Sequence, residues 1–229
     1  MINKLSVIVP VYNEKDTIEK IMEAILSVPI NKEILLVDDG SSDGTQKVIR
    51  EKFSDKKEVR LFFCEKNAGK GNAIRTGIEA ASGDAMIIQD ADLEYDPMDY
   101  LRLIKILEEA SANVVYGSRF MEKKKVTAFW HRFVNYFLTL TTNLLYFSHL
   151  TDMETCYKLF RSSLVKKLDL RSNGFEIEVE LTAKTLKLGE KIREVPITYQ
   201  GRSFHEGKKI GWKDGIKAFF LLFYYRVCD

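Results

Sequence analysis

Short apolar runs alternate with amphipathic helical segments along the first half of this 229-residue chain. Residues 5–11 form a nearly continuous run rich in Val and Ile, which is typical of a strand buried on both faces. Residues 18–26 then carry apolar side chains at helical spacing. The same alternation predicts further strands at residues 34–37, 59–63, 85–89 and 114–116, with helices between them. This order predicts right-handed βαβ units around a mostly parallel sheet.

The second half of the chain has a different pattern. Residues 127–150 are aromatic and aliphatic, with apolar side chains on one helical face, but polar residues interrupt the run and argue against a spanning helix. We expect another helix at residues 173–188, a strand around Val195 and a terminal helix that carries the apolar run 219–225. The aromatic stripe can serve as core or as a membrane-interface surface, and the sequence leaves both interpretations open.

Composition limits the class of protein. A chain with 45% apolar and 30% charged residues is an ordinary globular protein, and its length predicts one sizeable domain. A net charge of only +2 implies no broad nucleic-acid-binding surface. The three cysteines, Cys64, Cys156 and Cys228, are widely spaced, which favours reduced thiols in the cytoplasm over disulfides or a zinc site. The chain opens directly into a strand-like run, so we expect no secretory signal.

Polar clusters follow four of the predicted strands. They are Tyr12-Asn13-Glu14, Asp38-Asp39, the segment from Asn67 to Lys70, and Asp90-Ala91-Asp92. In an open parallel sheet the carboxyl ends of the strands meet at one edge, where ligands bind. Four polar clusters at one edge therefore predict a ligand site there.

Asp90 and Asp92 are the most specific of these residues. Side chains two apart on an extended chain point the same way, so both carboxylates can face one small volume. Two anions held that close repel each other unless a proton or a cation lies between them. Mg²⁺ or Mn²⁺ that bridges to a substrate diphosphate is a natural partner. The alternative is a polar loop in which Asp96, before Pro97, caps the next helix.

Taken together, several segments resemble the family 2 glycosyltransferases with the GT-A fold, in particular the branch that acts on dolichyl or polyprenyl phosphate. The segments are 9–14, 37–45, 67–71, 90–92, 117–120, 152–158, 173–176, 202–203 and 207–209. The resemblance implies an α/β fold with a mostly parallel central sheet flanked by helices, and amphipathic helices in the C-terminal half. It also implies a single catalytic domain over residues 1–229. Residues 1–120 would bind the nucleotide-sugar, and residues 121–229 the acceptor.

The resemblance also implies roles for individual residues. The donor base and ribose would contact Pro10, Tyr12 and Glu14, with Asp39 at the base edge and Lys70 near the base or phosphates. Metal ligation would fall to Asp90, Asp92 and Glu94, and Asp90 would also contact the ribose. Phosphate groups would be held by Arg119, Arg202 and Lys208, with Lys209 beside them.

The implied reaction is an inverting transfer of a hexose, glucose or mannose, from UDP or GDP to a polyprenyl or dolichyl phosphate. Asp92, Arg119, Arg202 and Asp152 are the expected catalytic residues. A phosphate acceptor is already anionic and needs cations more than a base.

Two other functions stay open at this level. A soluble relative acting on a sugar or protein hydroxyl would need a general base, for which Asp152, Glu176 and Glu178 are candidates. Glu176 also fits a helix-capping position after Asn173. A non-catalytic nucleotide-sugar-binding module is the other alternative, against which the intact acidic motif and Arg119 argue.

A membrane surface is the last expected partner. Interfacial helices combine an apolar face with basic flanks, and Lys123 to Lys125 precede the aromatic stripe. We therefore expect a cytoplasmic protein that attaches peripherally to the cytoplasmic face of a membrane.

Overall fold

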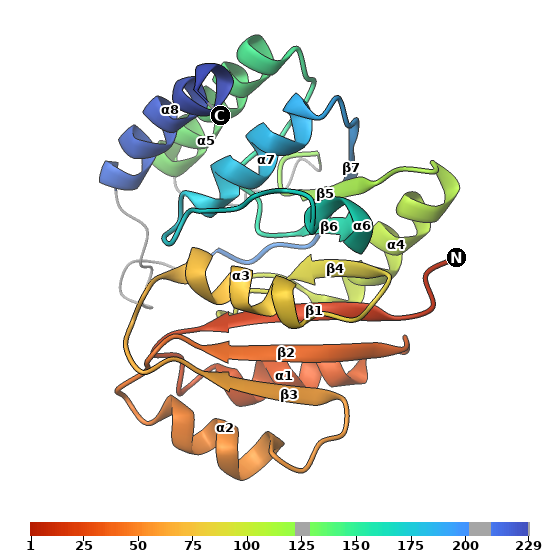
Figure 1. Cartoon of the computed structure of the whole chain (residues 1–229), viewed down its shortest axis with the longest axis vertical. Coiled ribbons are helices and arrows are strands. Elements are labelled where there is room, and N and C mark those ends of the chain that lie inside the picture. Colours follow the sequence, from red (N-terminus) through yellow and green to blue (C-terminus); the bar gives the residue numbers. More distant parts are fainter. Residues whose placement is uncertain (122–128, 202–211, 229) are drawn as a thin grey trace.

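The computed structural model describes residues 1–121, 129–201 and 212–228. Within them lies one seven-stranded sheet with the strand order β3-β2-β1-β4-β6-β5-β7 (Figure 1). The strands are β1 (Leu5–Val11), β2 (Lys32–Asp38), β3 (Val59–Phe63), β4 (Ala85–Ile88), β5 (Val114–Ser118), β6 (Lys158–Arg161) and β7 (Ile192–Pro196). The helices are α1 (Ile18–Ser27), α2 (Thr45–Phe53), α3 (Lys70–Ala80), the 3₁₀ turn η1 (Pro97–Asp99), α4 (Tyr100–Glu109), α5 (Phe129–Tyr146), α6 (Ser162–Val165), α7 (Ile177–Lys187) and α8 (Trp212–Val227).

The sheet is mostly parallel, as the sequence predicts. Strand β1 pairs in parallel with β2 and β4, β2 with β3, and β5 with β7. The exception is β6, which runs antiparallel between β4 and β5. Strand β6 was not predicted, because only Leu159 and Phe160 are apolar in its four residues and α6 follows directly after it.

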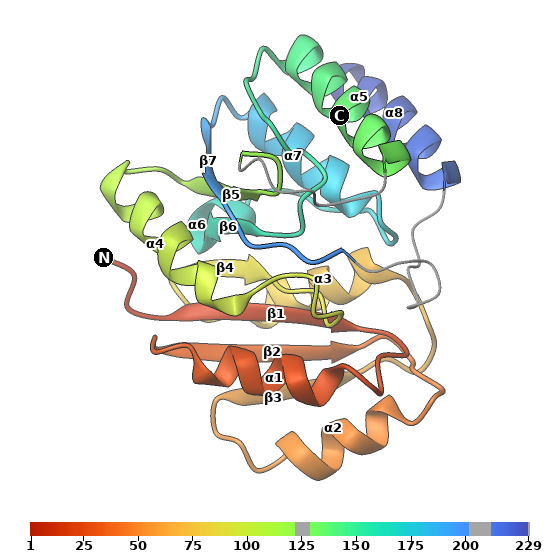
Figure 2. The ribbon, with the colours of Figure 1, turned by 180° about the vertical axis from the view of Figure 1, so that it is seen from behind.

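Helices cover both faces of the sheet. Figure 1 shows α3 and α7 in front of the strands, and Figure 2 shows α1 and α4 on the opposite face. Helix α1 buries Ile18, Ile21, Met22 and Ile25, the residues at helical spacing that predicted it. Strands β1 and β2 are buried almost throughout, because helices lie on both sides of them.

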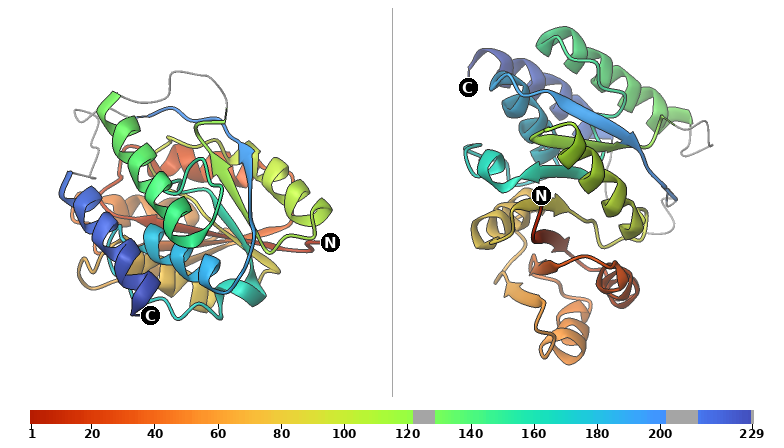
Figure 3. Two further views of the ribbon diagram at one scale, coloured as in Figure 1. Left: turned by 90° about the horizontal axis from the view of Figure 1, so that it is seen from above. Right: turned by 90° about the vertical axis from the view of Figure 1, so that its right-hand side faces the viewer.

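The helices of the C-terminal half add a further layer. In both views of Figure 3, α5 and α8 lie next to each other, beyond α7. A second apolar core joins these helices, separate from the core around the sheet. Its buried members are Leu138, Leu150, Met153, Val179, Ala183, Ala218, Leu222 and Tyr225. Part of the aromatic stripe is therefore core, while much of it faces outward.

Helix boundaries differ from prediction at two places. The helix expected after Asp96 begins as a 3₁₀ turn, in which the Asp96 carboxylate accepts a hydrogen bond from the Met98 N–H, so the cap at Asp96 is confirmed. The predicted helix at 173–188 begins only at Ile177, because the segment before it packs against α3. Gly189 ends that helix with a φ of 77°, as the sequence predicts.

Candidate active site

The four predicted polar segments follow β1, β2, β3 and β4, whose carboxyl ends lie at one edge of the sheet because these strands are mutually parallel. Strand β5 ends at the same edge, because it is antiparallel to β6, which is antiparallel to β4. The structure therefore brings the predicted residues to one edge. Arg202 and Lys208 lie outside the described residues.

Hydrogen bonds fasten the loops after β1 and β2 to each other. The Asn13 N–H donates to Ser41 Oγ at 2.8 Å, and Asn13 Oδ1 accepts from the Ser42 N–H at 2.9 Å. Asn13 has a φ of 51°, in the left-handed region that Asn tolerates better than most residues. Neighbouring Glu14 is buried, and its Oε2 accepts the Thr17 hydroxyl at 2.7 Å. Pro10 at the end of β1 and Tyr12 just beyond it are partly exposed on this rim.

Asp39 organises the loop that leads into α3. Its two carboxylate oxygens accept the N–H groups of Ala68 and Gly69, at 2.9 and 2.7 Å. A Cβ on Gly69 would lie 2.3 Å from the Asn173 carbonyl oxygen, so only glycine allows this close approach to the segment before α7. The approach brings Lys70, the first residue of α3, towards α7.

Four charged side chains of alternating sign form a chain under the rim. Lys70 Nζ lies 2.8 Å from Asp90 Oδ1 and 3.0 Å from Glu178 Oε1. Glu178 Oε2 in turn accepts from Lys158 Nζ at 2.5 Å. Burial opposes the charge on Lys70, but Asp90 and Glu178 hold its pKa well above the ordinary value. Burial likewise opposes ionisation of Glu178, yet Lys158 and Lys70 lower its pKa. Lys70 and Glu178 are therefore expected to be charged at neutral pH.

The loop that carries the acidic motif is fastened at its far end. Asp92 Oδ1 accepts the Glu94 N–H at 3.1 Å, and Glu94 Oε2 accepts the Tyr199 hydroxyl at 2.6 Å. The Glu94 carbonyl oxygen also accepts the Gln200 N–H at 2.9 Å. The motif is thus connected to the residues that directly precede the basic segment 202–211.

The donor set of this loop fits a hard cation only in part. No group of three His, Cys, Asp or Glu side chains in residues 1–121, 129–201 and 212–228 is arranged to hold a metal ion. The expected ligands Asp90, Asp92 and Glu94 are therefore not gathered around one point. Mg²⁺ is usually bound by one or two carboxylates together with substrate phosphates. Asp92, partly exposed on the rim, is suited to that arrangement, whereas Asp90 already lies against Lys70.

Arg119 lies just beyond β5 and is clamped by Asp152. Its Nε and Nη2 atoms each lie 2.7 Å from one oxygen of the Asp152 carboxylate, and its own N–H donates to the same group at 3.0 Å. Burial opposes the charge, but Asp152 keeps the pKa of Arg119 well above its ordinary value. Asp152 is itself fully buried, and its N–H donates to the Glu194 carboxylate. The guanidinium is thereby fixed in orientation.

All three candidate bases form ion pairs. Asp152 holds Arg119, and Glu178 lies between two lysines. Glu176 lies 2.9 Å from Lys217 Nζ of α8. Burial opposes ionisation of Glu176, but the contact with Lys217 and backbone hydrogen bonds lower its pKa. A lowered pKa makes a carboxylate a weaker proton acceptor. The geometry thus gives none of the three the surroundings of a general base.

Sequence reasoning missed three residues of this region: Lys158, Tyr199 and Glu154. Lys158 is fully buried, and no local pattern distinguishes it from a surface lysine. Tyr199 reaches Glu94 across 105 positions, a contact that only the fold creates. Glu154 lies between Asp152 and Lys158, inside a segment that resembles the family, and its spacing indicates no role of its own. Burial raises the pKa of Glu154 to about 7.

Comparisons with known proteins agree with this geometry. The profile of glycosyl transferase family 2 matches residues 6–169. A dolichol-phosphate mannosyltransferase of Pyrococcus furiosus is 29% identical over 214 residues, which are 91% of this chain and 60% of that protein. An undecaprenyl-phosphate mannosyltransferase of Micrococcus luteus is 28% identical, over 89% of this chain and 86% of its own.

Solved structures show the same fold. A glucosyl-3-phosphoglycerate synthase of Mycobacterium tuberculosis, in complex with Mn²⁺, UDP and glucosyl-3-phosphoglycerate, superposes with a TM-score of 0.71 at 21% identity. The match covers 98% of this chain and 80% of that one. The mixed sheet, with its flanking helices and acidic loop at the strand ends, is the GT-A fold. With the profile match over residues 6–169, these findings place the chain in glycosyl transferase family 2.

Proposed function

We propose that this protein is an inverting, metal-dependent glycosyltransferase that moves a hexose, glucose or mannose, from a UDP- or GDP-sugar to a polyprenyl or dolichyl phosphate. The acceptor assignment rests mainly on the ion pairs of the three carboxylates that could act as a general base. Asp152, Glu176 and Glu178 are all engaged with cations, whereas the rim presents an oriented guanidinium. A phosphate monoester is anionic before it attacks, so it needs such a cation and no base.

Donor binding falls to the loops after β1, β2 and β4. Pro10, Tyr12 and Glu14 are assigned to the base and ribose, together with Asp39 and Lys70. Asp90, held by Lys70, is suited to a ribose hydroxyl. A Mg²⁺ or Mn²⁺ ion held by Asp92, with Glu94 in the same loop, would stabilise charge on the leaving diphosphate.

Arg119 is assigned to a phosphate group, to which it offers a positive charge. Its Nε and Nη2 are bound to Asp152, so Nη1 is the terminal nitrogen through which we expect it to contact a phosphate oxygen. Because Asp152 fixes the guanidinium before substrate arrives, little orientation has to be acquired during the reaction. Arg202 and Lys208 are assigned to the same phosphate from the sequence resemblance alone.

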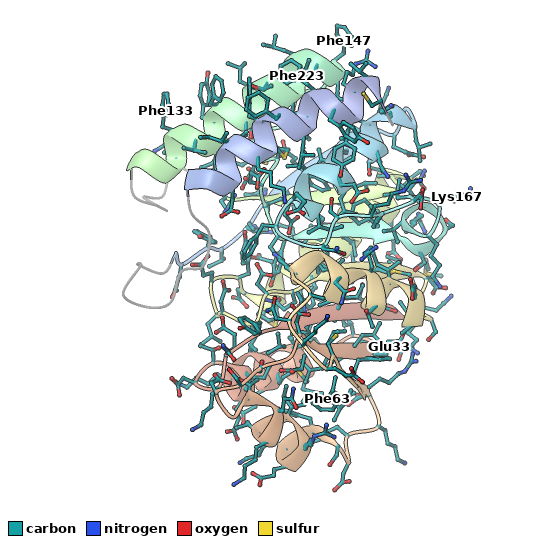
Figure 4. The ribbon with its side chains drawn as sticks, turned by 60° about the vertical axis from the view of Figure 1, so that its left-hand side comes forward. Glu33, Phe63, Phe133, Phe147, Lys167 and Phe223 are labelled. Atoms are coloured by element: carbon teal, nitrogen blue, oxygen red, sulfur yellow. The ribbon has the colours of Figure 1, made fainter. Side chains whose placement is uncertain are left out.

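The outer helices provide the membrane-facing surface in this proposal. Figure 4 shows Phe133, Phe147 and Phe223 on the outside of the layer formed by α5 and α8. Phe147 is 85% exposed, and Leu144 and Phe220 are more than half exposed. No helix in the described part of the chain is both long and apolar enough to cross a membrane. A peripheral position on the cytoplasmic face would bring a lipid phosphate to the acceptor half, residues 121–229.

The decisive experiment is a transfer assay with labelled UDP- and GDP-hexoses, in Mn²⁺ and in chelator. Acceptors are a short polyprenyl phosphate, the matching polyprenol, and simple sugars. We expect metal-dependent transfer to the lipid phosphate alone. Transfer to the polyprenol or to sugars, with the lipid phosphate inert, would contradict the acceptor. Donor binding without any transfer or hydrolysis would favour a non-catalytic module instead.

A further inference from the structure

Glu154 is an unused acidic residue beside the proposed phosphate site. It lies in the loop between α5 and β6, two residues after Asp152 and four before Lys158. The residue is partly exposed, but its Oε1 atom is shielded from solvent and has no hydrogen-bond partner in the described structure. An unsatisfied buried oxygen costs on the order of 1–3 kcal/mol, so its retention calls for an explanation.

Charges of both signs surround Glu154. Lys158 on β6 and Arg119 after β5 favour its ionised form, whereas Glu178 on α7 and Asp152 in its own loop oppose it. Both cations are already bound, Lys158 by Glu178 and Arg119 by Asp152. Burial has the largest effect on the ionisation of Glu154, and it raises the pKa of this residue to about 7. The neutral and the ionised carboxyl group are therefore both accessible near neutral pH.

A phosphate bound at Arg119 would favour the protonated form of Glu154 further. A second anion near a carboxylate disfavours ionisation, because like charges repel. Glu154 would then be a neutral carboxylic acid with an O–H group to donate. A protonated carboxylic acid in an apolar site can stabilise an oxyanion by donating a hydrogen bond. An ionised Glu154 would repel the same ligand.

We propose that Glu154 is a further binding residue, which in its neutral form donates one hydrogen bond to a phosphate oxygen held at Arg119. This inference rests on the proposed function only for the presence of a phosphate there. That phosphate can belong to the donor diphosphate or to the acceptor. The buried carboxyl group of Glu154 then finds its hydrogen-bond partner in the bound phosphate. Glu154 takes up a proton as the phosphate binds, and this favours phosphate ligands.

The test measures ligand binding without requiring transfer. Calorimetry with UDP and GDP in Mg²⁺, and separately with a short polyprenyl phosphate, is run from about pH 6 to about pH 9. Wild-type affinity should fall as pH rises above about 7, because the ionised form of Glu154 cannot donate a hydrogen bond. Binding should also take up a proton, which is measured by comparing binding enthalpies in buffers of different ionisation enthalpy. The ligand that shows this dependence identifies the source of the phosphate.

Three variants make the test specific. Glu154→Gln keeps a donor and cannot ionise, so it should bind at least as tightly as wild type, with no fall above pH 7 and no proton uptake. Glu154→Leu has a similar size and no donor, so binding should weaken about tenfold or more at low pH. Glu109→Gln, an exposed change at the end of α4, should behave as wild type.

Two results would overturn the assignment. In one, Glu154→Gln binds normally but loses transfer or donor hydrolysis, and the wild-type rate rises with pH through about 7. This result would identify Glu154 as a general base. In the other, all variants bind with the wild-type pH dependence, or the wild type binds no phosphate ligand. Wild-type phosphate binding with the expected pH dependence but no transfer would leave the assignment supported and count against the proposed function alone.

Discussion

Glu178 shows how a single residue can hold the site together. It contacts Lys70 of α3 and Lys158 of β6, so one carboxylate joins three elements. Buried ion pairs add little net stability on average, because desolvation offsets the attraction. Their removal is costly when one partner stays behind as an uncompensated charge. Glu178 therefore acts mainly to fix Lys70, and through it Asp90, in position.

Replacing Glu178 with Gln should destabilise the protein strongly. Lys158 is fully buried and would lose its counter-ion, which costs about 3–5 kcal/mol. The matched control is Glu176→Gln, whose partner Lys217 is 55% exposed and whose loss should cost less than about 1 kcal/mol. Urea unfolding monitored by circular dichroism gives both values. Equal losses for the two variants would show that the buried chain of charges does not hold these elements together.

Asp92→Asn tests the acidic motif while preserving shape. The amide is a poor ligand for Mg²⁺ compared with a carboxylate, so the Mn²⁺-dependent part of nucleotide binding should disappear and transfer should fall at least about 100-fold. Thermal-shift titration with UDP or GDP, with and without Mn²⁺, reads the first effect. Asp96→Asn, in the same loop but engaged in the cap of η1, should keep metal-dependent binding. Full activity of Asp92→Asn in chelator would exclude the metal role.

At the scale of elements, the sequence predicts whatever local periodicity determines. The alternation in residues 5–118 predicts strands β1 to β5 and the helices between them, and the position of the polar segments predicts the ligand-binding edge. Local periodicity does not predict β6, because its place between β4 and β5 depends on partners 40 or more positions away. The ion pair between Glu178 and Lys70 also joins residues far apart in the sequence, so spacing alone could not reveal it.

Glu33 joins elements at the opposite edge of the sheet, where Figure 4 labels it. From β2 its Oε1 accepts the Ser6 hydroxyl of β1 at 2.6 Å and the Ser82 N–H before β4 at 2.6 Å. Burial opposes ionisation, yet these hydrogen bonds and Lys4 lower the pKa of Glu33 to about 2. One side chain thus ties together β2, β1 and the segment that leads into β4.

A pH-dependent loss of stability should follow from Glu33. A folded-state pKa of about 2 lies below the unfolded value, so this stabilisation is present above about pH 4.3 and is lost as pH falls towards 2. Glu33→Gln should lower the free energy of unfolding by about 1–3 kcal/mol at pH 7, with a much smaller difference near pH 2.5. Urea midpoints at the two pH values measure it. Exposed Glu65→Gln serves as control, and a difference independent of pH would contradict the linkage.

At the scale of the whole molecule, the exposed side of α5 and α8 carries several large apolar side chains. It carries Phe133, Tyr136, Leu144, Phe147 and Phe220, each more than half exposed. Packing does not require them, because the core between the helices is made by other residues. A surface of this kind usually marks an interaction site.

Membrane binding by this surface is testable by flotation with anionic liposomes. The wild type should float, because exposed apolar side chains enter the interface and gain roughly 25 cal/mol per Å² of apolar area removed from water. The double variant Leu144→Ser and Phe147→Ser should float several-fold less, and Leu101→Ser, an exposed change on α4, should not differ from wild type. A monodisperse wild type that stays with the soluble fraction would assign the surface to a protein partner.

The place of β6 has a consequence for how the chain is made. Strand β5 leaves the ribosome before either of its neighbours, β6 and β7, has been synthesised. One side of β4 likewise has no partner until residue 158 has emerged. During synthesis, the nascent chain therefore carries exposed strand edges for roughly 40 to 70 residues of elongation, or several seconds at common translation rates. Residues 1–120 lack β6 and β7, so they could not complete this sheet alone.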